Sequence, residues 1–247
     1  MLRKYVLVAT VAFALPLSFA PAQAPAPAAP PVSITLGARH GHVTPSRSGF
    51  THTGGGNIDV AQPAPDTVVV TMTGVAVAGG HPCWNSAAAM TFDLTQAFEV
   101  SFDNPKVKKA KLTVEARVIG LLRSECKGDG SAGEGPGCAT ISADAGDGGT
   151  LHVCAPEHSV AGGENLSIND HDGPVEMAVM PGKYTLHETF TVSATHAKSL
   201  WPTKAASAEF APDPGLDPLW ISYWEPFHGA VKKDFGFQIT VKVAAAD

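Results

Sequence analysis

Beyond residue 24 the sequence lacks any long hydrophobic run. The one apolar run, from Tyr5 to Ala20, is interrupted by Pro16 and Ser18. It is shorter than the roughly 20 apolar residues that a membrane-spanning helix needs. We therefore expect no membrane span.

The sequence also lacks an excess of positive charge. It contains 17 Lys and Arg against 23 Asp and Glu, for a formal net charge of −6. Its basic cluster, between Lys106 and Lys111, directly precedes an expected strand and is typical of a solvated sheet edge. An acidic chain without a basic stripe excludes nucleic acid and anionic membrane surfaces as expected partners.

Familiar catalytic signatures are absent as well. The sequence contains no G-x-S-x-G elbow and no phosphate-binding glycine loop after a strand, and His187-Glu188 is not followed by the second histidine of H-E-x-x-H. Pairs of acidic residues occur, but one sequence does not show that two of them converge. We favour a non-catalytic role, with a hydrolase as an open alternative.

The first 24 residues carry the clearest signal. Arg3 and Lys4 precede the apolar run, and Ala22-Gln23-Ala24 follows it. A positive start, a hydrophobic stretch and an A-x-A site together predict a secretory signal peptide over residues 1–24. We therefore expect a secreted or periplasmic protein that matures in an oxidising compartment.

The remaining chain is expected to form one domain behind a tether. Residues 25–31 read PAPAAPP, which is typical of an extended, polyproline-like spacer. The strand signal is weak up to Gly54-Gly55-Gly56. We therefore assign residues 25–56 to a Pro/Ala-rich tether and flexible N-terminal segment, and residues 57–247 to the folded domain.

An all-β fold is predicted for this domain. Thr, Val and Ala are frequent, and the 25 Gly and 20 Pro suit tight turns. Alternating apolar and polar residues, which give a strand one buried and one wet face, occur in segments 66–78, 90–102, 110–122, 183–196 and 234–243. Residues 57–62 form a first, short alternating segment, and weaker strands fit 138–144, 150–155, 174–180 and 205–210. This pattern predicts a single antiparallel β-sandwich, jelly-roll or Ig-like, with long Gly/Pro-rich loops at 123–137 and 156–173.

Four cysteines in an exported chain predict two disulfides. If segments 138–145 and 147–154 form a hairpin centred on Gly146, Cys138 lies directly opposite Cys154 at bridging distance. This favours Cys138–Cys154 together with Cys83–Cys126. The alternative, Cys126–Cys138 with Cys83–Cys154, stays open because a shift of the turn by one residue would favour it.

The segment from Asp213 to Gly229 is rich in aromatic residues. Trp220, Tyr223, Trp224 and His228 lie in this Pro-rich connection before the last expected strand. An apolar loop normally packs onto the core, and this is the structural interpretation. Aromatic rings exposed beside acidic residues would instead stack on sugar rings, which makes these four residues candidate ligand-binding residues.

Two weaker patterns concern metals. The sequence Asn169-Asp170-His171-Asp172-Gly173 resembles part of a calcium loop, but the positions that need acidic residues carry Ile168 and Val179. Asp170 and Asp172 remain candidate calcium ligands, with no other cofactor expected. Two His-x-Cys pairs, His81-Cys83 and His152-Cys154, offer a set of ligands for a soft metal, although oxidised cysteines would not bind one.

Together these features predict a secreted, non-catalytic protein with a binding or structural role in the cell envelope or extracellular space. Its partner is an unidentified ligand there, polysaccharide or protein. The alternatives are a carbohydrate-binding or carbohydrate-active module that uses residues 213–229, and a metal-binding protein.

Overall fold

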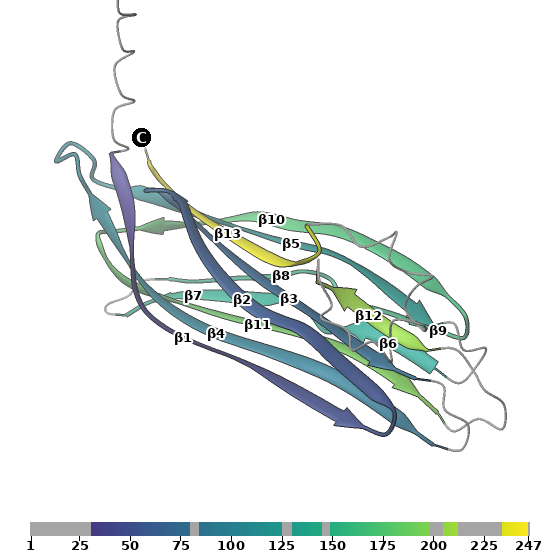
Figure 1. The fold of residues 1–247 in the computed structure, drawn as a ribbon. Helices are drawn as coiled ribbons and strands as arrows, with labels where there is room; N and C mark the ends of the chain where they lie inside the picture. The colour runs from purple at the N-terminus through teal and green to yellow at the C-terminus, as the bar shows by residue number, and fades with distance from the viewer. Residues whose placement is uncertain are drawn as a thin grey trace, which may run out of the picture.

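The computed structural model describes residues 31–79, 84–124, 130–144, 149–197, 205–211 and 234–246. All regular structure in these residues is β-strand, and the strands form two antiparallel sheets packed face to face (Figure 1). The predicted β-sandwich is therefore confirmed. Among the described residues there is no helix that would be long and apolar enough to cross a membrane.

Thirteen strands make up the described fold. They are β1 (Val32–Ser48), β2 (Thr51–Ala64), β3 (Thr67–Ala78), β4 (Ser86–Phe102), β5 (Ala110–Ser124), β6 (Gly130–Glu134), β7 (Cys138–Ala143), β8 (Thr150–Cys154), β9 (His158–Ala161), β10 (Asn165–Val179), β11 (Gly182–His196), β12 (Ala206–Phe210) and β13 (Gly236–Ala245).

One sheet has the order β1-β4-β11-β6-β9, with β7 also pairing with β11 and β8 with β7. We call it sheet A. In sheet B the order is β10-β5-β12-β3-β13, with β2 added beside β3. Both β12 and β13 pair with β3 and with β5, so they lie one after the other in the same gap between these two strands.

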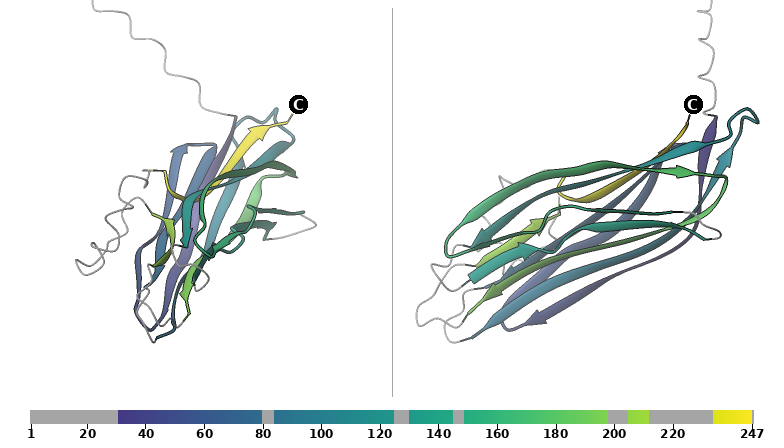
Figure 2. Two further views of the ribbon diagram at one scale, coloured as in Figure 1. Left: turned by 90° about the vertical axis from the view of Figure 1, so that its right-hand side faces the viewer. Right: turned by 180° about the vertical axis from the view of Figure 1, so that it is seen from behind.

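The long strands give the sandwich two distant ends (Figure 2). In the β1–β4 pair, Val32 lies opposite Phe102 and Ser48 lies opposite Ala87. At about 3.3 Å per residue, the 17 residues of β4 span roughly 55 Å. The loop between β4 and β5 holds both ends of the described chain, because the Asp103 amide donates to the Pro31 carbonyl and the Ala246 amide to the Lys109 carbonyl. We call this the near end, and the opposite end, where β4 begins, the far end.

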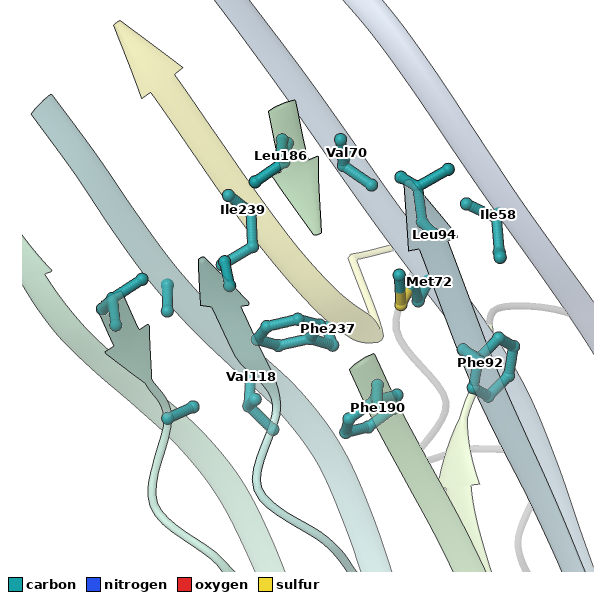
Figure 3. Close-up of a cluster of buried hydrophobic side chains, with 14 of the residues drawn as sticks. Ile58, Val70, Met72, Phe92, Leu94, Val118, Leu186, Phe190, Phe237 and Ile239 are labelled. Carbon is teal, nitrogen blue, oxygen red and sulfur yellow. The ribbon is translucent and has the colours of Figure 1, made fainter. Parts of the chain in front are cut away.

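The core lies between the sheets and is centred on aromatic residues (Figure 3). The ring of Phe190, from β11 in sheet A, stacks on that of Phe237, from β13 in sheet B, with centroids 5.2 Å apart. Phe210 meets Phe190 edge to face at 5.5 Å, and Phe92 lies 5.9 Å away. All four rings are fully buried, so this cluster joins the two layers.

Glycine makes room for one of these rings. A Cβ atom at Gly74 of β3 would overlap the end of the Phe92 ring, which comes from the other sheet. The close approach of β3 to Phe92 therefore depends on the missing side chain at residue 74.

The folded part begins earlier than the sequence indicated. Strand β1 and the first half of β2 lie in residues 25–56, which we had assigned to a tether and flexible segment. Strand β1 is an edge strand whose residues after Ile34 are mostly exposed on both faces. Such a strand shows no alternation, so its sequence resembles a loop although its backbone is paired with β4 along its length.

Two short strands were also missed. Strand β6 lies in the expected loop 123–137, and β9 in the expected loop 156–173. Segment 90–102 belongs to the unbroken β4, and its partner β1 has a bulge between Leu36 and Arg39, opposite Ala97. The Gln96 side chain is buried and donates to the carbonyl oxygens of Gly37 and Ala97.

Candidate functional site

At the far end, four neighbouring strands of sheet A surround a hollow of about 460 Å³. Strand β11 ends there at His196, which lies opposite Ser86 at the start of β4 and Gly130 at the start of β6. The residues that line the hollow are Asn85, Ser86, Gly130, Ser131, Ala161, Thr195, His196 and Ala197. We call it the far-end hollow.

Side-chain hydroxyls and an imidazole line this hollow. The hydroxyl groups of Ser131 and Thr195 lie 2.7 Å apart on paired strands. Ser86 is buried and donates to the Gly79 carbonyl, and His196 is almost fully buried. Asn85, Ser131 and Thr195 can therefore offer hydrogen-bond donors and acceptors to a ligand, and the described lining residues carry no carboxylate or ammonium group.

An exposed tryptophan lies next in sequence to the residues that line the hollow. Trp84 directly precedes the lining residues Asn85 and Ser86, and 58% of its surface is exposed. A large ring in this setting is unusual, because burying it would be worth roughly 2–3 kcal/mol. Exposed aromatic rings and neutral polar groups are the side-chain types that sites for polyhydroxylated ligands commonly use.

A second polar group lies along the open edge between the sheets. Its centre is His158 of β9, whose Nδ1 lies 2.5 Å from Oε1 of Glu134 on β6 and whose Nε2 lies 2.8 Å from Oδ2 of Asp170 on β10. Glu134 has no exposed side-chain surface, His158 is 23% exposed and Asp170 39%. This chain of three residues therefore links sheet A to sheet B and leads from the interior to solvent.

Burial raises the pKa of Glu134 to about 7, despite the hydrogen bond and positive charge that His158 offers it. When Glu134 is protonated, its hydroxyl donates to Nδ1 of His158, and Nε2–H of His158 donates to Asp170. The arrangement attaches the two sheets to each other, and both imidazole nitrogens are occupied by carboxylates, which leaves neither for a metal.

The two candidate calcium ligands are both on β10, on its inward-facing side. Asp170 is engaged by His158, as described, and Asp172 lies opposite Ala116 of β5, beside a bulge and the cis Gly173-Pro174 bond. Asp172 is partly buried. Among the described residues, neither aspartate belongs to a cluster of three or more His, Cys, Asp or Glu side chains close enough to hold a metal ion together. A calcium site at Asp170 and Asp172 stays a prediction.

The disulfide Cys138–Cys154 is present, as predicted from the hairpin. The two residues lie opposite each other in the β7–β8 pair, with Cα atoms 4.1 Å apart. Cys83 and Cys126 lie outside the described residues, as does His81 of the first His-x-Cys pair. The aromatic candidates Trp220, Tyr223, Trp224 and His228 also lie outside them, so their role as ligand-binding residues stays a prediction.

Two buried glutamates were not anticipated. Glu188 of β11 is fully buried in the sandwich interior, and neither carboxyl oxygen has a hydrogen-bond partner among the described residues. Burial raises the pKa of Glu188 well above its ordinary value. Glu209 of β12 is also fully buried; it accepts a hydrogen bond from Ser207 and lies 3.5 Å from Arg123. Burial raises the pKa of Glu209 to about 7, against the opposing effects of both partners.

A larger hollow, of about 580 Å³, opens at the near end. It is lined mostly by backbone and apolar groups, among them Met177 and Met180, the latter 59% exposed. The Tyr184 hydroxyl faces it but is already bonded to the carbonyl and amide of Met180. The far-end hollow is smaller yet collects more polar side chains.

Comparison of the chain with protein-family models, with curated proteins and with solved structures finds no match.

Proposed function

We propose that this protein is an exported, non-catalytic binding module that holds a polysaccharide at its far end. The observation that carries the proposal is the exposed Trp84, next in sequence to Asn85, which lines a hollow together with Ser131 and Thr195. An aromatic ring supplies the apolar face on which a sugar ring stacks, and neutral hydroxyl and amide groups match the hydroxyls of the sugar.

The position of the hollow supports a tethered arrangement. Pro31 and Ala246 lie at the near end, roughly 55 Å from Ser86. A module attached through residues 25–31 therefore directs its far end away from the attachment point. Export itself is proposed from the signal sequence in residues 1–24 and is supported by the Cys138–Cys154 disulfide, which is typical of oxidising compartments.

The proposal is tested with affinity electrophoresis of the mature chain in gels that contain one purified polysaccharide each. We expect retardation by at least one neutral polysaccharide, and Trp84→Ala to weaken binding by about tenfold or more, as is usual for a central aromatic contact. Met180→Ala is the matched control, because Met180 is equally exposed but lies at the near end. We expect it to bind like the wild type.

Unchanged retardation of the Trp84→Ala protein would reject the far-end site. The double variant Trp220→Ala and Trp224→Ala then tests the other aromatic candidates, and loss of binding in that variant alone would transfer the site to residues 213–229. If no polysaccharide retards the wild-type protein or any variant, polysaccharides are rejected as the ligand class.

A further inference from the structure

The β7–β8 hairpin carries three residues of metal-binding type on its outer face. One ligand atom from each of Cys138, His152 and Cys154 lies within 4.8 Å of the other two. His152 is exposed and both cysteines are partly so. In the oxidised protein the two sulfur atoms are joined to each other, and only free thiolates bind metals strongly.

The imidazole of His152 is oriented toward these sulfurs. Its Nδ1 atom lies 2.9 Å from Oγ1 of Thr140, the residue opposite on β7, and its Nε2 atom lies 3.0 Å from Sγ of Cys154. In metal sites a ligating histidine commonly makes a hydrogen bond through its second nitrogen, which fixes the ring and the tautomer. Thr140 is placed to act in this way and leaves Nε2 directed at the sulfur atoms.

We propose that reduction of the Cys138–Cys154 disulfide turns this face of the hairpin into a Zn²⁺ site. The ligands are Sγ of Cys138, Sγ of Cys154 and Nε2 of His152, with a water molecule in the fourth position. This site is separate from the far-end hollow and does not depend on the function proposed for it.

The reaction is a thiol–disulfide exchange followed by metal binding. A dithiol reductant supplies two electrons and two protons and becomes a disulfide, while the Cys138–Cys154 bond breaks and two thiols form. Binding of Zn²⁺ then releases both thiol protons to solvent, because thiolates are the ligands.

The dimensions of the hairpin suit this ion. Tetrahedral Zn²⁺ with Zn–S bonds of about 2.3 Å holds two sulfurs about 3.8 Å apart, and an imidazole nitrogen slightly closer to each. The paired strands place the two Cα atoms 4.1 Å apart, so rotation of the side chains is enough to open the sulfurs to that distance. Two soft thiolates and one imidazole favour Zn²⁺ over Ca²⁺ or Mg²⁺.

The test uses the mature chain carrying Cys83→Ser and Cys126→Ser, so that Cys138 and Cys154 are its only cysteines. The protein is reduced with a phosphine, freed of reductant and titrated with Co²⁺ and then Zn²⁺ under anaerobic conditions. We expect one Co²⁺ per chain with the intense visible bands of tetrahedral thiolate coordination, displacement by Zn²⁺, and no such bands before reduction.

Three further variants in the same background separate the ligands. Cys154→Ser should abolish the bands, His152→Ala should weaken Zn²⁺ binding by at least tenfold, and Thr140→Val should weaken it about tenfold through loss of ring orientation. His171→Ala, an exposed histidine on β10 in the other sheet, is the control and should have no effect. Absence of tetrahedral bands in the reduced protein, equal affinity of the His152→Ala variant, or loss of the β-sheet circular dichroism on reduction would each overturn the proposal.

Discussion

At the edge between the two sheets, the imidazole Nδ1 of His158 lies 2.5 Å from the carboxyl Oε1 of Glu134. The two residues are 24 positions apart and meet because β9 pairs with β6 so that His158 lies opposite Glu134. Asp170, from the other sheet, holds the second imidazole nitrogen. His158 is therefore both the partner of a buried carboxyl group and a connection between the layers.

Removal of this imidazole should destabilise the protein. His158→Ala leaves the buried Glu134 carboxyl without its side-chain partner, and we expect the free energy of unfolding at pH 7 to fall by about 1–3 kcal/mol. Urea denaturation measures this change. His187→Ala is the control, because its contact with Asp93 is half exposed and should contribute less than about 0.5 kcal/mol. Equal effects of the two substitutions would refute the linking role of His158.

Replacement of Glu188 by leucine should stabilise the protein. The carboxyl group lies between the two sheets with no hydrogen-bond partner, so its burial opposes folding. We expect Glu188→Leu to raise the free energy of unfolding at pH 7.5 by about 1–3 kcal/mol, with a smaller gain at pH 5. Glu99→Leu, on the exposed face of the adjacent strand β4, should be close to neutral. A destabilised Glu188→Leu protein would mean that this carboxyl group has a partner that the structure does not show.

The stability of the protein should decrease as the pH rises from 5 to 8. Burial raises the pKa of Glu134 and of Glu209 from 4.5 to about 7, and that of Glu188 well above 4.5. Above pH 4.5 the unfolded chain releases these protons while the folded protein retains them. The free energy of unfolding therefore falls as the pH rises, until the pH exceeds the pKa of each group in the folded protein. Each of Glu134 and Glu209 contributes on the order of 3 kcal/mol to this decrease.

Thermal unfolding at fixed ionic strength from pH 5 to pH 8 measures the effect. In the double variant Glu134→Gln and Glu209→Gln the dependence on pH should be clearly flatter. A wild-type melting temperature that rises through this interval would contradict the assignment of raised pKa values.

The close contact between β3 and the Phe92 ring predicts that Gly74 does not tolerate a larger side chain. Gly74→Ala places a Cβ atom inside the space of the ring, and we expect a loss of about 1–3 kcal/mol from overpacking. Gly135→Ala is the matched control, because its nearest neighbour, Cβ of Thr191, would be at an ordinary contact distance of 3.5 Å. Similar chemical denaturation midpoints for the two variants would show that the Phe92 ring moves aside freely.

The sequence predicted the strands that have one dry and one wet face. Strand β5 alternates regularly from Ala110 to Val118 because its even positions face the core. In contrast, β1 has little buried surface after Ile34, and β6 and β9 are only five and four residues long. Hydrophobic periodicity carries no information about such strands, since their position is set by pairing with neighbours.

The candidate site was less predictable than the disulfide. Cys138 and Cys154 could be paired because they are equidistant from one turn, which is a local property of the sequence. Ser86, Ser131 and Thr195 come together only through the order of β4, β11 and β6 in sheet A. One sequence does not specify strand order, and Trp84, which lies far in sequence from the other three tryptophans, gave no pattern to draw attention to this end.

The most direct test of the far-end site is a titration of ¹⁵N-labelled mature protein that is monitored through its amide chemical shifts. The ligands are soluble oligosaccharides of a polysaccharide that retards the protein in gels. The account predicts saturable shifts at Asn85, Ser131 and Thr195, with Met180 and Lys183 at the near end unchanged. Shifts confined to Met180, Lys183 and their neighbours, or no saturable shift at the far end, would contradict it.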